Sequence, residues 1–200
     1  MKSSDERRAN VLPTESLMEE HRVIERMLKV IEAISDRLEK GDNVSPDILE
    51  NVLDFIRTFA DKCHHGKEED LLYPRAESRG IPREGGPIGM MLIEHDEGRS
   101  FVKEMAKALE KHSGGDRSVQ TVFANNGKAY SGLLSQHIYK EDNILYPMIN
   151  NVLSEEDQEE MSERFERVER ERIGEGRHHH YIHLIEGLER EFVEPQGFDS

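Results

Sequence analysis

Two segments of the sequence place a histidine four residues before a glutamate and then continue alike. The first reads HHGKEEDLLYP from His64, and the second reads HIYKEDNILYP from His137, an offset of 73 residues. Residues four apart lie one above the other on a helix, so each segment can direct an imidazole nitrogen and a carboxylate oxygen to one point. The spacing therefore predicts two metal-ligating pairs, His64 with Glu68 and His137 with Glu141.

One further histidine precedes each segment, and each of these follows a glutamate. Glu20-His21 and Glu94-His95 lie at matching distances, 43 and 42 residues before the histidines of the repeat. The chain thus contains one helical hairpin twice. Packing the two hairpins together would gather six side chains near the middle of a core: His21, His64, Glu68, His95, His137 and Glu141.

Apolar residues at spacings of three and four predict the helices that hold these groups. The expected helices run from about Leu17 to Gly41, from Ser45 to Pro74, from about residue 88 to Gly114-Gly115, and from about Val119 to Pro147. Residues 74–87 hold three prolines and three glycines and are expected to form a loop. Four helices with short connections are typical of an up-down-up-down four-helix bundle, so we predict an all-α chain.

The bundle is expected to occupy residues 14–150. A C-terminal extension over residues 154–192 follows, with a Glu- and Arg-rich, solvated helix that begins at Ser154 and a last helix from Arg177 to about Phe192. Residues 1–12 and 193–200 are expected to be flexible.

Burying two carboxylates among four imidazoles requires a partner other than a side chain. Bare carboxylates are almost never buried, and the imidazoles could neutralise them only by becoming cations. Bound metal removes this conflict. Six ligands are too many for one tetrahedral zinc but suit two octahedral ions bridged by the glutamates. Carboxylate and imidazole ligands without thiolate favour two iron ions as the cofactor, with manganese second and zinc third.

The composition disfavours several function classes. The chain has 42 acidic and 27 basic side chains, a net charge of −15, which argues against nucleic acid or an anionic membrane as a partner. Its longest apolar run is four residues, and its first twenty residues hold no export signal, so we expect a soluble, cytoplasmic protein. Cys63 is the only cysteine and is expected to be a small buried residue. Oligomeric state is left open.

The order His21, His64-x-x-x-Glu68, His95, His137-x-x-x-Glu141 resembles the hemerythrin-like HHE cation-binding family, including the K-E-(E/D)-x-x-L-Y-P continuation. The resemblance covers about residues 14–150. It implies a non-haem di-iron centre inside a four-helix bundle, with a small diatomic molecule or peroxide as the ligand. Oxygen-carrying members have a further histidine four residues after the one on the third helix, where this chain has Arg99.

Because that ligand is missing, the resemblance points to reaction with small molecules rather than to reversible oxygen carriage. The predicted function is peroxide decomposition or nitric oxide detoxification at the two irons. A non-catalytic sensor of oxygen or iron, and an iron donor for damaged iron centres, are the alternatives. No separate catalytic residue is predicted.

Several neighbouring residues could support the ligands. Glu20, Glu69 and Glu94 are candidates to accept the second N–H of a metal-bound imidazole. His65 would point about 100 degrees away from His64 on an α-helix, so we expect it at the surface or behind the ligands.

Two other features are interpreted as structural. Tyr130 lies seven residues before His137 on the same face and is expected in the core, with gating of the site as the alternative. The His178–His183 run is expected on a packing helix with surface histidines, with a lid over the bundle as the alternative.

Overall fold

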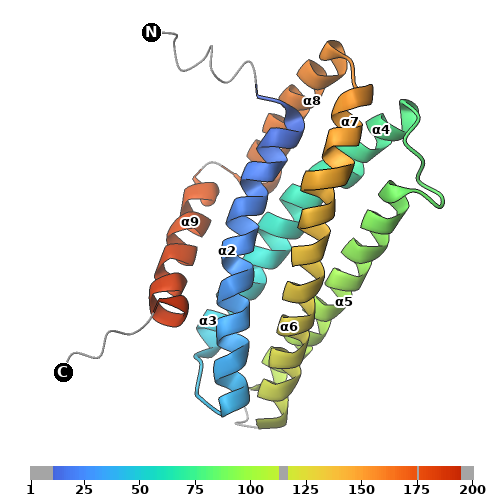
Figure 1. Cartoon of the computed structure of the whole chain (residues 1–200). Helices are drawn as coiled ribbons and strands as arrows, with labels where there is room; N and C mark the ends of the chain where they lie inside the picture. Colours follow the sequence, from blue (N-terminus) through green and yellow to red (C-terminus); the bar gives the residue numbers. More distant parts are fainter. Residues whose placement is uncertain (1–10, 113–116, 175, 195–200) are drawn as a thin grey trace.

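The computed structural model describes residues 11–112, 117–174 and 176–194, and within them the chain is helical without strands. Four long helical segments run alternately up and down (Figure 1). The first is α2 (Pro13–Lys40), and the third is α5 (Pro87–His112). The second consists of α3 (Pro46–Phe55), the π-helices η1 (Ile56–His65) and η2 (Glu68–Leu72), and α4 (Tyr73–Ser78). The fourth consists of α6 (Arg117–Lys140), the π-helix η3 (Glu141–Leu145) and α7 (Tyr146–Val152). The predicted all-α four-helix bundle is confirmed.

Local sequence accounts for the ends of the first two segments. Gly41 ends α2 with φ at 85°, a left-handed conformation that glycine adopts at no steric cost. Ser45 is the N-cap of α3, and Pro46 occupies its first turn, where the missing N–H of proline is harmless. The predicted break at Gly114-Gly115 lies outside the described residues. Of the ends expected to be flexible, residues 1–12 and 193–200, the parts 1–10 and 195–200 also lie outside them.

Pro74 and Pro147 do not end their helices, contrary to the sequence prediction. Each occupies the first turn of an α-helix, α4 and α7, that follows a π-helical turn without interruption. Proline ends an α-helix because it lacks a donor and its ring collides with the carbonyl four residues earlier. The wider π turn changes the hydrogen-bonding register at that point, so the chain continues as a helix. The expected loop is therefore shorter than residues 74–87.

Two apolar clusters occupy opposite ends of the bundle. The larger includes Ile24, Phe59 and Phe123, and the smaller includes Leu17 and Ile149. His21 lies one turn of α2 after Leu17 and one turn before Ile24, so it belongs to a polar layer enclosed between the two clusters. Side chains in this layer are thereby removed from water.

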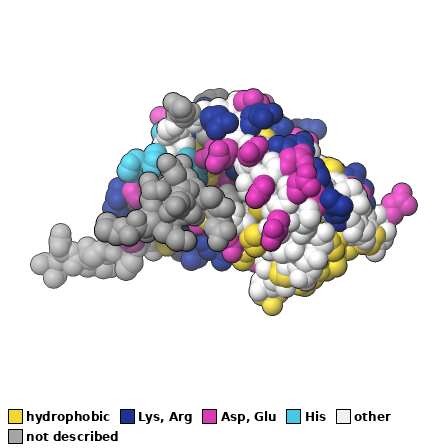
Figure 2. Space-filling view, turned by 90° about the horizontal axis from the view of Figure 1, so that it is seen from above, with side chains coloured by type: hydrophobic (Ala, Val, Ile, Leu, Met, Phe, Trp, Pro, Cys, Tyr) yellow, Lys and Arg dark blue, Asp and Glu magenta, His cyan; other side chains and the backbone are white. Residues whose placement is uncertain are grey.

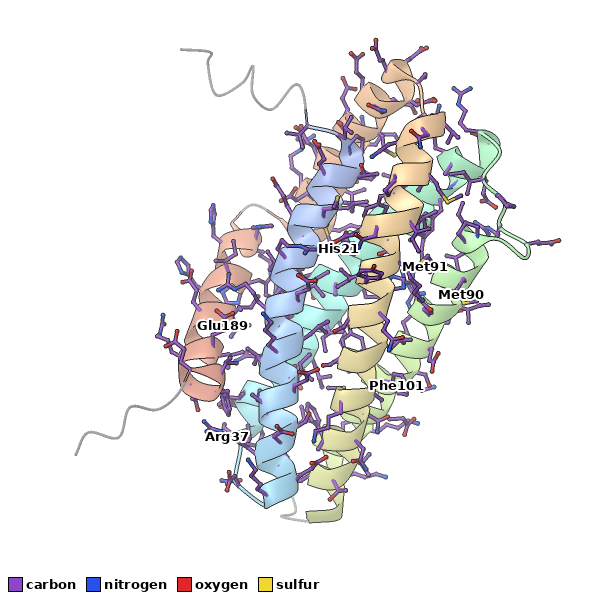
Figure 3. The ribbon with its side chains drawn as sticks, viewed as in Figure 1. His21, Arg37, Met90, Met91, Phe101 and Glu189 are labelled. Atoms are coloured by element: carbon purple, nitrogen blue, oxygen red, sulfur yellow. The ribbon has the colours of Figure 1, made fainter. Side chains whose placement is uncertain are left out.

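The C-terminal helices are α8 (Glu155–Val168), η4 (Glu169–Ile173), α9 (Arg177–Leu188) and η5 (Glu189–Val193). Met161 and Phe165 of α8 are buried in the smaller apolar cluster, so this helix is not wholly solvated. The last segment lies along the outside of α2 (Figure 1), where Glu189 accepts two hydrogen bonds from Arg26 at 2.6 and 3.0 Å. Arg37 donates to the Glu191 carbonyl at 2.6 Å near the end of the same contact (Figure 3).

Acidic and basic side chains alternate on the end of the molecule seen in Figure 2, and hydrophobic side chains gather along one edge. On α5, Met90 is 50% exposed and the adjacent Met91 is 3% exposed, so the two point in different directions (Figure 3). Among the described helices, none has the length and apolar character needed to cross a membrane.

Candidate metal centre

The six residues predicted as ligands come together in the polar layer of the bundle. His21 comes from α2, His95 from α5, and the two histidine–glutamate pairs from the second and fourth segments. All six are 1% exposed or less. The His21 label in Figure 3 marks the level of this layer along α2. The six side chains are therefore almost entirely shielded from bulk water.

The imidazoles divide into two groups, and one oxygen of each central glutamate lies between the groups. His21, His64, Glu68 and Glu141 have ligand atoms within 4.8 Å of one another, and so do His65, His95 and His137. Glu68 Oε2 lies 3.8 Å from His64 Nε2 and 3.5 Å from His95 Nε2. Glu141 Oε2 lies 3.2 Å from His21 Nε2 and 3.3 Å from His137 Nε2. Each glutamate thus faces one imidazole of each group.

Every imidazole predicted as a ligand has a carboxylate on its outer nitrogen. The Nδ1 contacts are His21 with Asp142 at 2.7 Å, His64 with Glu20 at 2.9 Å, His95 with Glu69 at 2.7 Å, and His137 with Glu94 at 2.8 Å. A carboxylate at Nδ1 accepts its proton and leaves the Nε2 lone pair free to bind a metal. All four Nε2 atoms consequently point into the centre.

The remaining residues of the repeat hold these partners in place. Lys67 and Lys140 form ion pairs with Glu20 and Glu94 respectively. Each tyrosine of the repeat crosses to the glutamate of the other hairpin: Tyr146 donates to Glu68 Oε1 at 2.5 Å, and Tyr73 donates to Glu141 Oε1. The K-E-(E/D)-x-x-L-Y continuation therefore supplies a cation, a central carboxylate, an outer carboxylate and a hydroxyl.

The π-helical turns explain how both the glutamate and the tyrosine reach the interior. Glu68 is the first residue of η2, and Tyr73, five positions later, directly follows its last residue. Glu141 and Tyr146 have the same positions relative to η3. A π-helix bonds residue i to residue i+5, so residues at this spacing share a face, as they would not in an α-helix. The spacing from glutamate to tyrosine is a sequence signal for this turn.

His65 belongs to the centre, contrary to the expectation that it would point away. It is 4% exposed, and its ring stacks on that of His95 with centroids 3.9 Å apart. The expectation assumed α-helical geometry, but His65 ends the π-helix η1, in which successive side chains are rotated by less than in an α-helix. Both His64 and His65 can therefore face the interior.

The centre leaves buried polar atoms without partners, which is the condition that a bound cation would satisfy. Only four buried side-chain atoms in the described residues lack a hydrogen bond, and three of them are His21 Nε2, Glu68 Oε2 and Glu141 Oε2. An unsatisfied buried polar group costs about 1–3 kcal/mol, and more when it is charged. Imidazole nitrogens and carboxylate oxygens in this arrangement fit two metal ions.

Without metal, two of the imidazoles hold protons. Burial would lower the pKa of His21, but its Nδ1 hydrogen bond to Asp142 and its close contact with the charged Glu141 raise it to about 9. Burial is likewise outweighed at His137, where the charge of the nearby Glu141 and the Nδ1 hydrogen bond to Glu94 raise the pKa to about 10. Both side chains are cations at neutral pH in the metal-free centre.

The pKa values of two further imidazoles of the centre are lowered, and those of the two glutamates shift in opposite directions. Burial and the charge of His21 lower the pKa of His64 to about 4, and burial also lowers the pKa of His95, to about 3. Burial and the charge of Glu141 raise the pKa of Glu68 well above its ordinary value. Burial has the same tendency at Glu141, but the charges of His137 and His21 hold that pKa well below its ordinary value. Protons thus supply positive charge to the metal-free centre.

The model of the hemerythrin HHE cation-binding domain matches residues 12–149, more than two thirds of the chain. The chain belongs to the hemerythrin HHE family. Proteins described only as uncharacterised, from Mycobacterium bovis and from two strains of Mycobacterium tuberculosis, are each 24% identical to this hemerythrin domain protein over 188 residues. That alignment covers 94% of this chain and 73% of each relative.

The position that carries a histidine in oxygen-carrying hemerythrins is filled here by Arg99, which makes ion pairs with Asp61 and Glu69 at 2.8 and 2.7 Å. His65 reaches the same group of imidazoles from η1 instead. Five imidazoles and two glutamates therefore surround the centre, one imidazole more than the sequence prediction contained. A histidine at position 99 is thus not needed to bring a third imidazole into this group.

Three remaining features agree with their structural interpretations. Cys63 is 1% exposed, and its burial raises the pKa of its thiol to about 12. Tyr130 is buried in the larger apolar cluster. On α9, Tyr181 and Ile185 pack into that cluster while His183 is exposed, so the His178–His183 run forms a packing helix with surface histidines.

Proposed function

We propose that this hemerythrin domain holds two iron ions and decomposes peroxide, with nitric oxide as the other small molecule on which it would act. The observation that supports the metal centre is the set of inward-facing atoms without hydrogen bonds, His21 Nε2, Glu68 Oε2 and Glu141 Oε2. His21 and His64 would hold one ion, and His65, His95 and His137 the other, with Glu68 and Glu141 between them. A pair of irons would supply the exchange of two electrons with a peroxide.

The unequal division of imidazoles supports reaction at one side of the centre. The group of His21 and His64 contributes two nitrogens, and the other group contributes three. The ion with fewer protein donors has more positions open to an exchangeable ligand. Decomposition of two hydrogen peroxide molecules to two water molecules and dioxygen balances without an external reductant, so the two irons held by these residues would need no further reactant.

The protein's own groups would position the ligands and retain the protons. Tyr73 and Tyr146 each fix one oxygen of a central glutamate and leave the other oxygen facing the imidazoles. The outer carboxylates orient the imidazoles, and the surrounding apolar clusters exclude water, which strengthens each of these electrostatic contacts.

The test is elemental analysis of the purified protein together with dioxygen release after hydrogen peroxide is added. We expect about two irons per chain and sustained dioxygen evolution. The His95→Ala variant should lose metal and turnover together, and a His179→Ala/His183→Ala variant should retain both because these side chains lie on α9, apart from the centre. Full metal content without consumption of peroxide or nitric oxide would favour a sensor or an iron donor. Absence of stoichiometric metal would refute the centre.

A further inference from the structure

A cleft leads from the surface to the imidazoles His65 and His95 between η1 and α5. Its volume is about 550 Å³, and Tyr130 of α6 is among the residues that line it. Neither hydrogen peroxide nor nitric oxide needs such a space, because a water-sized molecule takes roughly 30 Å³. Cavities of this volume are instead typical of sites for organic molecules.

The cleft continues along the bundle as a groove. A second hollow of about 380 Å³ between α3 and α5 shares Arg57, Ala106 and Glu110 with the first. From His95 to Lys107 the axis of α5 advances by about 18 Å. The combined space is therefore long and narrow, which suits a chain-like molecule better than a compact one.

Apolar groups line the interior of the cleft. Val102 of α5 and Ile56 of η1 face it, together with Ala106 and Tyr130. Val102, Ile56 and Tyr130 are 8% exposed or less, so these walls belong to the buried core rather than to the outer surface. A hydrocarbon chain placed there would be removed from water, which stabilises the bound state by about 25 cal/mol for each Å² of apolar surface buried.

The rim of the cleft is rich in cations although the whole chain has a net charge of −15. Arg57, Arg99, Lys103 and Lys107 line it, against the carboxylates of Asp61 and Glu110.

These four cations differ in how firmly they are already paired. Arg99 is engaged by Asp61 and Glu69, and Lys107 forms an ion pair with Glu104 at 2.6 Å. Arg57 has a looser contact with Glu50 at 4.0 Å. Lys103 has no carboxylate within 4.0 Å among the described residues, so its ammonium group can pair with an anion at the rim.

We propose that this cleft binds an organic monoanion with a flexible apolar chain, such as a medium-chain carboxylate. Its carboxylate lies at the rim near Lys103 and Lys107, and its apolar end extends past Val102 toward His65 and His95. A molecule bound in this way lies between solvent and one side of the metal centre, so it controls access to that side. Only this last consequence rests on the proposed metal function.

The experiment is isothermal titration calorimetry of decanoate into the full chain, first without metal and then after loading with iron. We expect saturable binding in both forms, and weaker binding of decanol, which has the same chain without the charge. The Lys103→Glu/Lys107→Glu variant should bind decanoate about tenfold more weakly. The control is Lys29→Glu/Lys111→Glu, which makes the same change of charge at two exposed lysines outside the cleft and should bind normally.

A second variant tests the apolar part of the cleft. The Ala106→Phe side chain would occupy the place where the two hollows meet, and it should abolish decanoate binding while helical circular dichroism and metal content are unchanged. Equal binding of decanol and decanoate, or normal decanoate binding by the rim variant, would overturn the proposal. Decanoate binding to a protein that takes up no metal would support the cleft and refute the proposed function, so the two failures are distinguishable.

Discussion

Replacing His65 with glutamine should reduce the metal content from two ions to one at limiting metal concentration. The change removes one of three imidazoles from the group that includes His95 and His137 and leaves His21 and His64 intact. Structural sites with four ligands bind zinc with about 10–16 kcal/mol, or roughly 2.5–4 kcal/mol for each ligand. Loss of one ligand should therefore lower the affinity of the protein for that ion about 10²- to 10³-fold.

The assay is titration of the metal-free protein with Fe²⁺ under anaerobic conditions in the presence of a competing chelator, followed by elemental analysis after gel filtration. The wild-type protein should show two tight sites and the His65→Gln variant one. The matched control is His183→Gln, because that imidazole lies on α9 with a side chain 79% exposed, 3.3 Å from Glu186. The control should bind as the wild type does.

A rescue variant tests the geometric reason for this prediction. Residue 99 follows His95 by one turn of α5, and Arg99 lines the cleft that ends at His65 and His95. The His65→Gln/Arg99→His variant should therefore recover part of the affinity of the weakened site. Two sites of wild-type affinity in the single His65→Gln variant would refute the assignment of His65 and with it the division into groups of two and three imidazoles.

Two other predictions concern protons and the supporting charges. Metal binding at pH 7 should release about two protons per chain, because His21 and His137 hold protons in the metal-free centre and must lose them to bind metal. An indicator dye or buffer-dependent calorimetry measures these protons, and apparent metal affinity should rise as pH is raised. Release of fewer than one proton would contradict this assignment. The Glu20→Gln variant leaves the buried Lys67 ammonium without its counter-charge. The free energy of unfolding of the metal-free protein should therefore fall by about 3 kcal/mol, and its Tm by about 6–12 °C in thermal melts. The control is Glu186→Gln on the surface, and an unchanged Tm for Glu20→Gln would show that this ion pair adds no stability.

The repeat in the sequence was sufficient to predict the fold and the gathering of six side chains. Spacings of three and four depend only on the geometry of a single helix, and a duplicated hairpin can bury its histidines only against its own copy. Glu20, Glu69 and Glu94 were also identified correctly as partners of the imidazoles, because residues next to a ligand on a helix lie close to the same layer.

Other partners could not be assigned from the sequence because they join distant segments. Asp142 contacts His21 and Tyr146 contacts Glu68 across the interface between the two hairpins, where relative rotation and translation of the helices decide which side chains meet. No spacing within one segment contains that information. The long-range charges that set the protonation of the centre come from the same packing.

His65 shows most directly what depends on the tertiary structure. Local α-helical geometry directs it away from His64, and only a π-helical η1 packed against α5 brings it onto His95. The π-helical conformation is stable there because the free energy gained by burying several interior side chains outweighs the cost of the less favourable π hydrogen bonds. Sequence spacing thus determines which residues can share one helix face, whereas packing between helices decides the local helix type, the fifth imidazole and the cleft that reaches it.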